Sequence, residues 1–380
     1  MAPPAGPEIW VTGLAWTTPL GDTLDGVWGR LLAGDTGLHP TPSAHPLRTD
    51  RAGVVPGVPL DWAPSRRQHA ITVPTLAAAF GSAGLDPADP AVRLVLGTSF
   101  GSGLDEPTAY LGAWADAAAA SIGHPHPPVS VSTACSAGAD GIAVAVELIR
   151  AGTTEICVAG GADVVTPAKR LGHSALGTMS RDTLRAFDRR HDGMVPGEGA
   201  AFLVLETAGS ARRRGAAPRA ILRGTGAAND ATGLTAPDPT GDSVVLAVDR
   251  CLAGSGYGAA DVAVVNAHGT ATPLNDAVEE TSLGRMFGGR DTPPVVFATK
   301  GALGHSLGAT GAIEAVAVVL ALRDRKVPPI VGLDEPTAGF PLPLAIGGPA
   351  ALCPGVGLSL TLGFGGFNTC LLFEGVDDAA

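Results

Sequence analysis

The chain of 380 residues is poor in aromatic and charged side chains. Phe, Trp and Tyr together make up 4% of it and charged residues only 16%, whereas glycine occurs 53 times. The mean hydropathy is +0.26. This composition excludes an intrinsically disordered chain, and the abundant glycine indicates close backbone packing and many tight turns. A chain of this length can bury a large core and suggests about two domains.

Basic residues are scarcer than acidic ones. Lys and Arg number 25 against 36 Asp and Glu, which gives a formal net charge of −11. Binding of nucleic acid without sequence preference requires a basic face, so we expect no nucleic-acid partner. An acidic total remains compatible with a local basic patch.

Cysteine is sparse, at Cys135, Cys157, Cys251, Cys353 and Cys370. These residues form no C-x-x-C pair and no metal-ligand spacing with histidine, so no metal site is expected. An odd and sparse set predicts reduced thiols and a cytoplasmic location.

Targeting and membrane segments are not evident either. The opening MAPPAGPEIW has neither the basic segment nor the apolar core of a secretory signal. The most apolar helix candidate, AIEAVAVVLAL, carries Glu314 and is too short to cross a bilayer, so we expect no membrane association.

Alternating β-branched and helix-like segments indicate the α/β class. Strands are predicted at 9–15, 92–99, 155–163, 201–206, 262–270 and 360–366. Two helices, 138–150 and 312–323, are apolar on nearly every face, which predicts that they lie together in a central layer between two sheets. Each follows a turn of small residues and precedes a strand candidate, 155–161 and more weakly 327–333. This pattern is a faint internal repeat.

Four segments combine small residues with reactive side chains: TACSAG (133–138), NAHGTATPLND (266–276), ATKGALGHSLGATG (298–311) and TLGFGGFNT (361–369). Cys135 at a helix start would feel the helix dipole, which favours the thiolate and lowers the pKa of the thiol. A buried structural cysteine is the alternative, and it suits the other four. Taken singly, His268 and His305 are equally well interpreted as loop histidines. No segment spells a phosphate-binding glycine motif, so nucleotide binding is rejected.

Taken together, Cys135, His268, Lys300 and His305 offer a thiolate, two imidazoles and a cation. With them the sequence resembles the β-ketoacyl synthase (condensing enzyme) family of the thiolase superfamily. The resemblance covers nearly the whole chain and is carried by residues 11–38, 186–206, 267–288 and 299–316. It implies a five-layered αβαβα fold built from two pseudo-repeated halves, here 1–215 and 216–380, with two central buried helices.

The resemblance also implies roles for individual residues. Cys135 would accept the acyl chain as a thioester, and His268 and His305 would assist decarboxylation of the malonyl group and hold the enolate. Lys300 would have an electrostatic and orienting role near the second histidine. Glu279 and Glu314 would be acidic partners of that lysine, and Thr270 and Thr272 would hydrogen-bond the phosphopantetheine arm. Phe364 would be the gate, and its N–H would complete the oxyanion hole with that of Cys135. Gly365 and Gly366 would bind substrate.

The function expected from the resemblance is decarboxylative Claisen condensation of a Cys-bound acyl group with malonyl-acyl carrier protein (ACP), in fatty acid or type II polyketide biosynthesis. No cofactor would be bound permanently, because the phosphopantetheine arm of ACP carries the acyl and malonyl thioesters. Two alternatives are a ketosynthase-like acyltransferase with another acceptor and a partner subunit similar to a chain-length factor. The intact Cys135 argues against the second.

The family is dimeric, which implies either a homodimer or a ketosynthase/chain-length-factor heterodimer here, with strand 155–163 pairing across the two-fold axis. The stretch between 103 and Cys135 is shorter than in the family, and Leu360, Thr361, Leu362 and Phe367 make the gate region more apolar. An acidic ACP would dock on a basic rim. Candidates for this rim are Arg66 and Arg67, Lys169 and Arg170, and Arg212–Arg214.

Overall fold

Ten strands form one continuous mixed sheet in the computed structural model, which describes residues 6–107 and 110–376. Residues 1–5 of the opening segment and residues 108–109 of the shortened stretch lie outside the described residues. Across the sheet the strands are β10 (Val295–Phe297), β9 (Val262–Asn266), β13 (Val356–Gly363), β14 (Phe367–Gly375), β8 (Ala220–Asn229), β1 (Ile9–Thr17), β7 (Gly199–Thr207), β6 (Ile156–Asp163), β4 (Val92–Gly97) and β5 (Val129–Val131). Two small ribbons lie outside it, β2 (Leu38–Pro40) with β3 (Arg51–Gly53), and β11 (Lys326–Val327) with β12 (Ala350–Ala351).

The sheet consists of two halves with the same strand order. A short pairing of Ile9–Val11 with Ala220–Leu222 joins β1 to β8 at the centre. When the strands of each half are numbered in chain order, both halves have the order 3-2-4-5-1 from the outer edge to the centre. These orders are β5-β4-β6-β7-β1 and β10-β9-β13-β14-β8. The faint repeat in the sequence therefore corresponds to a repeated topology, while the boundary at 215 stays a prediction.

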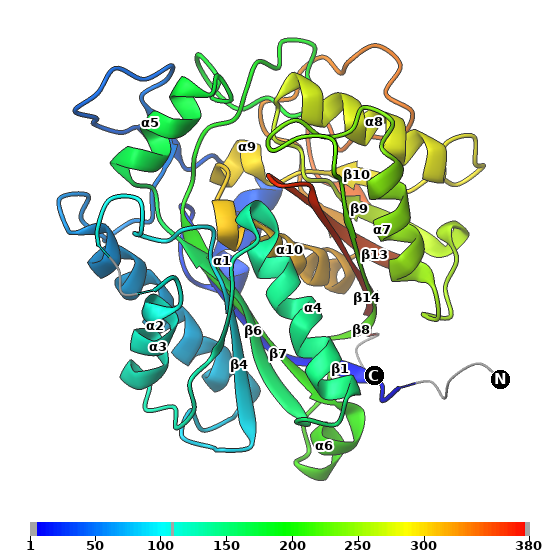
Figure 1. Cartoon of the computed structure of the whole chain (residues 1–380). Coiled ribbons are helices and arrows are strands. Elements are labelled where there is room, and N and C mark those ends of the chain that lie inside the picture. The colour runs from blue at the N-terminus through cyan, green and yellow to red at the C-terminus, as the bar shows by residue number, and fades with distance from the viewer. Residues whose placement is uncertain (1–5, 108–109, 377–380) are drawn as a thin grey trace.

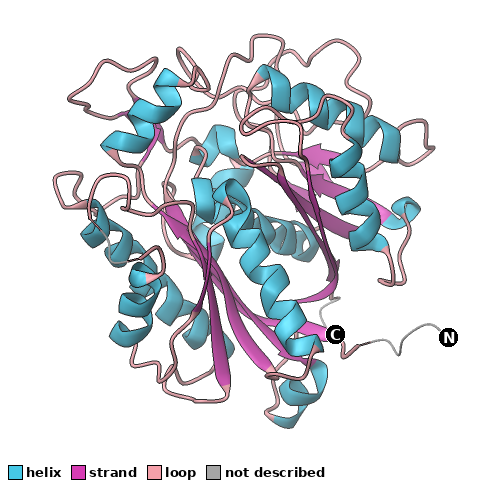
Figure 2. Ribbon diagram, in the orientation of Figure 1, coloured by secondary structure: helices cyan, strands magenta, loops and turns pink. Residues whose placement is uncertain are grey.

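Helices lie between and outside the two halves of the sheet (Figures 1 and 2). Their bounds are α1 (Leu24–Leu32), α2 (Pro64–Ala83), α3 (Ala113–Ser121), α4 (Ala137–Arg150), α5 (Pro167–Ala175), α6 (Ala208–Arg213), α7 (Asp242–Leu252), α8 (Pro273–Phe287), α9 (Lys300–Leu303) and α10 (Thr310–Asp324). Helix α2 contacts the outer face of the first half and carries α3 on its far side, α7 contacts the second half and carries α8, and α4 packs on α10 between the two halves. The five layers are those that the sequence predicts.

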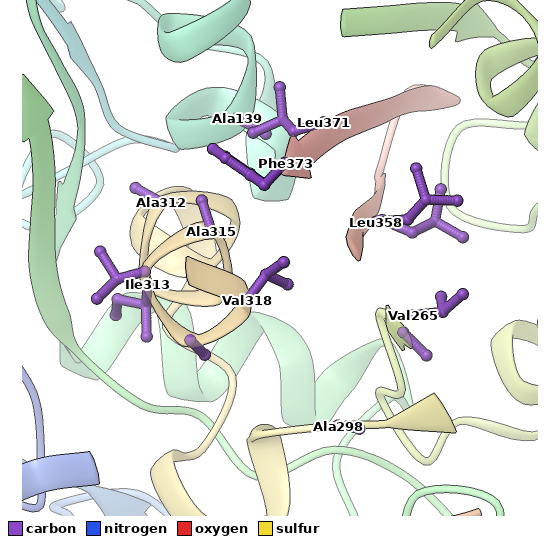
Figure 3. Packing of buried hydrophobic residues seen from close by; sticks show 14 of the residues in the cluster. Ala139, Val265, Ala298, Ala312, Ile313, Ala315, Val318, Leu358, Leu371 and Phe373 are labelled. Carbon is purple, nitrogen blue, oxygen red and sulfur yellow. The ribbon is translucent and has the colours of Figure 1, made fainter. Parts of the chain in front are cut away.

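The central layer is close-packed because small residues line the contact between α4 and α10. A Cβ on Gly311 would lie 2.6 Å from the Cβ of Ala139, and one on Gly138 would lie 2.9 Å from the carbonyl oxygen of Gly308. Apolar side chains of α10, such as Ile313 and Val318, fill the space toward the strands (Figure 3). Residues 310–321 of α10 are all buried, as predicted, whereas α4 exposes Glu147.

Two predictions about strands are wrong. Residues 327–333 contribute only Lys326–Val327 to a two-residue strand, because two prolines follow at once and cannot continue a ladder. Strand β6 cannot pair across a two-fold axis, since β7 and β4 occupy both of its edges. The strand at the outer edge of this half is β5. Among the helices of the described residues, none has the length and apolarity needed to span a bilayer.

Candidate active site

Cys135, His268 and His305 meet although they come from three separate segments. Cys135 lies in a short 3₁₀ turn before α4, His268 follows β9, and His305 lies between α9 and α10. Their sulfur and nitrogen ligand atoms are all within 4.8 Å of one another. The two imidazole rings are 5.2 Å apart between centroids and nearly perpendicular. All three side chains are buried, with relative exposures of 6%, 2% and 3%.

The turn that carries Cys135 is held in a strained conformation. Ala134 has φ +51°, in the left-handed region, which costs a non-glycine residue about 1–3 kcal/mol. Asp140 of α4 accepts a hydrogen bond from the hydroxyl of Thr133 at 2.6 Å and another from Thr369 of β14 at 2.5 Å. These bonds tie the turn to both α4 and the second half of the sheet, and so fix the position of the sulfur.

Lys300 is buried behind the two histidines and is fully engaged. Its Nζ donates to Glu314 Oε1 at 2.6 Å, to His268 Nδ1 at 3.2 Å and to the carbonyl oxygen of His268. Burial lowers the pKa of His268 and of His305 well below the ordinary value, and the cation of Lys300 lowers both pKa values further. Both imidazoles are therefore neutral at physiological pH.

The tautomer of each neutral imidazole follows from its Nδ1 partner. An ammonium group has only hydrogens to donate, so His268 Nδ1 accepts from Lys300. The backbone N–H of Leu307 donates to His305 Nδ1 at 3.2 Å, so this nitrogen also accepts. Each ring then carries its proton on Nε2. Because both rings line the same cavity as Cys135, the site holds two N–H donors beside one sulfur.

Glu279 fixes the loop that carries His268. Its carboxylate accepts from the backbone N–H of His268 at 2.6 Å and of Gly269 at 2.7 Å. Asn275 Nδ2 donates to the same carboxylate at 2.7 Å. Sequence reasoning missed Asn275, although an amide four residues before a buried glutamate on one helix was a usable signal. Glu279 thus supports the site from behind, without lining the cavity.

The GFGG turn joins β13 to β14 and approaches the nucleophile from the other side. The backbone N–H of Phe364 lies close enough to the sulfur of Cys135 to lower the pKa of its thiol. Gly365 and Gly366 have φ +84° and +79°, and a Cβ on Gly366 would lie 1.9 Å from the carbonyl oxygen of Asp230. Glycine is therefore required for the turn that directs the Phe364 N–H at Cys135.

The prediction of a lowered pKa for Cys135 is wrong. Burial raises the pKa of the thiol to about 11, against the lowering effects of the Lys300 cation and the Phe364 N–H. Desolvation of the charged form outweighs the favourable groups around it. The resting nucleophile is consequently a neutral thiol rather than a thiolate.

A cavity of about 270 Å³ leads to the sulfur. It is lined by Thr270, Thr272, Gly365 and Gly366, as expected, and the two threonine hydroxyls lie 2.9 Å apart. Lys300, Glu279 and Glu314 lie outside the lining. The cavity also receives His173, at the end of α5, which no sequence motif indicated. The segment containing it reaches the site only through the tertiary fold.

Most of the basic residues predicted to form the docking rim for ACP cannot do so, because they are buried or lie far from the cavity. Arg67 is buried and binds Glu198 at 2.6 Å, and Lys169 is buried against Asp163. Arg170 is buried and donates to three backbone carbonyl groups. The Arg212–Arg214 cluster begins on α6, at the opposite end of the molecule from α5 and α8, which border the cavity (Figure 1). Of these predicted rim residues, Arg66 is exposed and stays a candidate for docking ACP. Its guanidinium stacks on Trp62.

Comparison with protein families gives matches along most of the chain. The model described as "Beta-ketoacyl synthase, N-terminal domain" matches residues 7–211, and "Beta-ketoacyl synthase, C-terminal domain" matches residues 219–334. The 3-oxoacyl-(acyl-carrier-protein) synthase 2 of Rhizobium meliloti is 31% identical over 418 aligned positions, covering 97% of this chain and 98% of that enzyme. The enzyme of the same name from Synechocystis is 37% identical over 263 residues, which cover 67% of this chain and 63% of that enzyme.

Solved structures give the same fold. The ishigamide ketosynthase/chain length factor matches with a TM-score of 0.89 and 27% identity, covering 98% of this chain and 100% of that chain. The thiolase-like architecture expected from the resemblance is therefore the architecture of this chain.

Proposed function

Because this chain belongs to the β-ketoacyl synthase family, we propose that it joins a Cys135-bound acyl group to malonyl-ACP by decarboxylative Claisen condensation. Its relatives are condensing acyltransferases of fatty acid or polyketide biosynthesis, and the chain is an enzyme of this class. One observation carries the proposal: a buried thiol lies beside two imidazoles whose Nδ1 partners leave each Nε2 as a donor. Such a set provides a nucleophile and two donors for negative charge on oxygen.

The first step is transfer of the acyl group to Cys135. The sulfur attacks the carbonyl carbon of an acyl thioester, and the carbonyl oxygen becomes an oxyanion. The N–H groups of Phe364 and Cys135 are its proposed donors, and the Phe364 N–H is already directed at the sulfur. When the intermediate collapses, the C–S bond to the carrier breaks. The carrier sulfur leaves with the proton that Cys135 gives up. The products are therefore an acyl-Cys135 thioester and a free carrier thiol.

The second step is loss of carbon dioxide from the malonyl thioester. The bond between the carboxylate carbon and the methylene carbon breaks, and its electron pair moves to give an enolate on the thioester oxygen. The Nε2–H groups of His268 and His305 would donate to that oxygen. Both imidazoles can donate while neutral, because each carries its proton on Nε2, and Lys300 and burial keep both rings neutral.

The third step forms the carbon–carbon bond. The enolate carbon attacks the carbonyl carbon of the acyl-Cys135 thioester, the C–S bond breaks, and the Cys135 thiolate takes up a proton from the solvent. The raised pKa of Cys135 makes reprotonation favourable. The product is a β-ketoacyl group on the carrier, which leaves the thiol ready for another acyl group.

The carrier arm is assigned to the part of the cavity that Thr270 and Thr272 line. A phosphopantetheine arm contains amide groups, and the paired hydroxyls of Thr270 and Thr272 line the cavity as hydrogen-bonding partners for them. ACP is accordingly the proposed partner, and no permanently bound cofactor is required. All five cysteines are free, which is compatible with the predicted cytoplasmic location.

A second subunit is proposed at the free edge of β5. Val129 on this edge has 44% relative exposure. Phe100 at 49% and Leu111 at 43% line one pocket, and the residue before Phe100 accepts a hydrogen bond from Ser132, just after β5. An exposed strand edge beside apolar surface is an expected pairing site. The partner subunit is either a second copy of this chain or a chain similar to a chain-length factor. The similarity to a ketosynthase/chain length factor is the reason for including the second of these partners.

Intact-protein mass spectrometry after incubation with a panel of acyl-ACPs tests the proposal. We expect a mass increase equal to the acyl group, located on Cys135 by peptide mapping and absent from Cys135→Ala. The exposed Cys353 provides a matched control, because Cys353→Ala should load normally. Loading that persists in Cys135→Ala, or no loading under conditions in which a related synthase is acylated, would contradict it.

A further inference from the structure

A third imidazole, that of His173, lines the cavity with Cys135, His268 and His305. It lies near the C-terminal end of α5, in the first half of the chain. Its ring is 5.8 Å from the ring of Phe364, between centroids, with the planes inclined at 40°. His173 therefore contacts the residue whose N–H is directed at the nucleophile, and none of the proposed steps uses it.

The hydrogen bonds of His173 differ in polarity from those of the other two histidines. The hydroxyl of Thr178 donates its one hydrogen to the carbonyl oxygen of His173, 3.2 Å away. The same hydroxyl oxygen lies 3.1 Å from His173 Nδ1. Because its hydrogen points to the carbonyl oxygen, we assign it as the acceptor in this contact and place the ring proton on Nδ1. Burial lowers the pKa of His173 to about 4, helped by the nearby Lys169 cation. The ring is neutral, and its Nε2 keeps a lone pair.

Nε2 of His173 is available to a ligand. Within residues 6–107 and 110–376 it has no hydrogen-bond partner. The two carboxylates that line the cavity are committed to the protein. Asp192 accepts from Ser180 and the Arg181 backbone, and Asp230 accepts from backbone N–H groups. The cavity thus presents two imidazole donors near the sulfur and one imidazole acceptor next to Phe364.

We propose that His173 is a specificity-determining residue whose Nε2 accepts a hydrogen bond from an O–H or N–H group of the bound thioester. This inference rests on the proposed function, because it concerns the substrate that reaches Cys135. A saturated acyl chain offers no such donor. A hydroxyl on the acyl chain offers one, and so does an amide N–H of the carrier arm. The contact with Phe364 favours the acyl hydroxyl, since Thr270 and Thr272 lie on a different loop.

The test measures binding rather than turnover. In the Cys135→Ala background, calorimetry compares two pairs of N-acetylcysteamine-type thioesters. One pair is a 3-hydroxyacyl and the saturated acyl thioester of equal length. The other pair carries the same acyl group on N-acetylcysteamine or on its analogue with an ester oxygen in place of the amide N–H. His173→Phe keeps a ring against Phe364 but removes the acceptor, and His173→Gln retains an acceptor. His39→Phe replaces an exposed histidine on β2 and is the matched control.

The ratio of dissociation constants within each pair is the deciding quantity. A neutral hydrogen bond corresponds to about a three- to tenfold ratio. We expect His173→Phe to abolish a preference of that size in one pair, while His173→Gln and His39→Phe retain it. Loss in the hydroxyacyl pair identifies the acyl chain as donor, and loss in the amide pair identifies the arm.

Three results would overturn the inference: no preference in either pair, a preference that His173→Phe leaves unchanged, or an equal loss of affinity for both members of each pair. The last would show that the ring only packs against Phe364. Failure of the proposed function is a separate result. It would appear as His173-dependent binding without acylation of Cys135 in the otherwise unmodified protein.

Discussion

At the scale of single residues, the chemistry is decided by the groups behind the reactive side chains. His268 and His305 are alike in type, yet it is Lys300 behind one and the Leu307 N–H behind the other that make each Nε2 a donor. At His173 the hydroxyl of Thr178 accepts from Nδ1 instead, which leaves Nε2 as an acceptor. The direction of each hydrogen bond, more than the residue type, therefore assigns a role.

Replacing either donor should separate the two half-reactions. His268→Ala and His305→Ala each remove one proposed donor to the enolate oxygen, so we expect decarboxylation of malonyl-ACP to fall by about 10²–10³. Transfer of the acyl group to Cys135 uses backbone donors and should persist. Carbon dioxide release and intact mass measure the two steps separately. Equal losses in both steps would contradict the assignment.

Alkylation of Cys135 should depend steeply on pH. Its pKa is raised to about 11, so the reactive thiolate is the minor form at neutral pH and increases as pH rises toward that value. We expect the rate with iodoacetamide to rise about tenfold per unit between about pH 7 and pH 10. Cys353→Ser removes the exposed thiol, and peptide mapping then follows Cys135. A plateau below about pH 9 would show that the thiol is activated in the resting site.

The sequence was sufficient to predict that Cys135, His268, Lys300 and His305 belong to one site, because their four motifs together resemble those of the family. The structure brings Cys135, His268 and His305 within 4.8 Å of one another and places Lys300 beside His268. The sequence was insufficient for the pKa of the thiol, since the helix dipole is local but desolvation depends on the whole fold. His173 was missed for the same reason. Only the packing of α5 onto the GFGG turn brings it into the cavity.

At the scale of elements, the site depends on how closely α4 approaches α10. Cys135 precedes the first helix and His305 precedes the second, so the distance between the helices sets the distance between nucleophile and donor. Gly311 and Ala139 permit this approach. Small residues at a helix contact therefore have a catalytic consequence, although they carry no reactive group.

A single methyl group at this contact should be costly. A Cβ on Gly311 would lie 2.6 Å from that of Ala139, so we expect Gly311→Ala to lower the free energy of unfolding by about 1–3 kcal/mol. Gly81, in α2, has nothing within 4 Å of such a Cβ, and Gly81→Ala should stabilise by about 0.5–1 kcal/mol. Denaturant unfolding measures both. Equal effects from the two substitutions would show that the helix contact is not tight.

Hydrophobic patterning predicted β1, β4, β6, β7, β9 and both central helices, because these elements are largely buried, but it missed the long strands β8 and β14. It failed for short elements. Strand β5 has only three residues and follows two prolines, so no pattern indicated it, yet it forms the edge of the sheet. The longer and more apolar β6 was assigned that edge instead, although burial on both faces is also what an interior strand requires.

At the scale of the whole molecule, the exposed edge of β5 and the apolar residues near it indicate an incomplete surface. Leu111 comes from the shortened stretch before the nucleophile and Phe100 lies just ahead of it, so this stretch connects the proposed interface to the active site. A change of the second subunit at this interface would then alter the structure close to Cys135.

Light scattering should find a dimer that depends on this face. Phe100→Asp places a charge in the apolar patch, and we expect it to weaken self-association by at least about tenfold, because an unpaired buried charge is strongly unfavourable. Leu246→Asp changes a similarly exposed residue on α7 and should leave association unchanged. A protein that is monomeric alone but dimeric with a chain-length-factor-like subunit would identify a heterodimer. A Phe100→Asp variant that still dimerises would move the interface elsewhere.

The most direct test of the central claim follows one turnover by mass. Protein loaded with an acyl group on Cys135 is mixed with malonyl-ACP, and both proteins are weighed. We predict that Cys135 loses its acyl group while the carrier loses carbon dioxide and gains that acyl group, which gives a β-ketoacyl-ACP. Release of the acyl group to water or to another acceptor, with malonyl-ACP unchanged, would contradict the account.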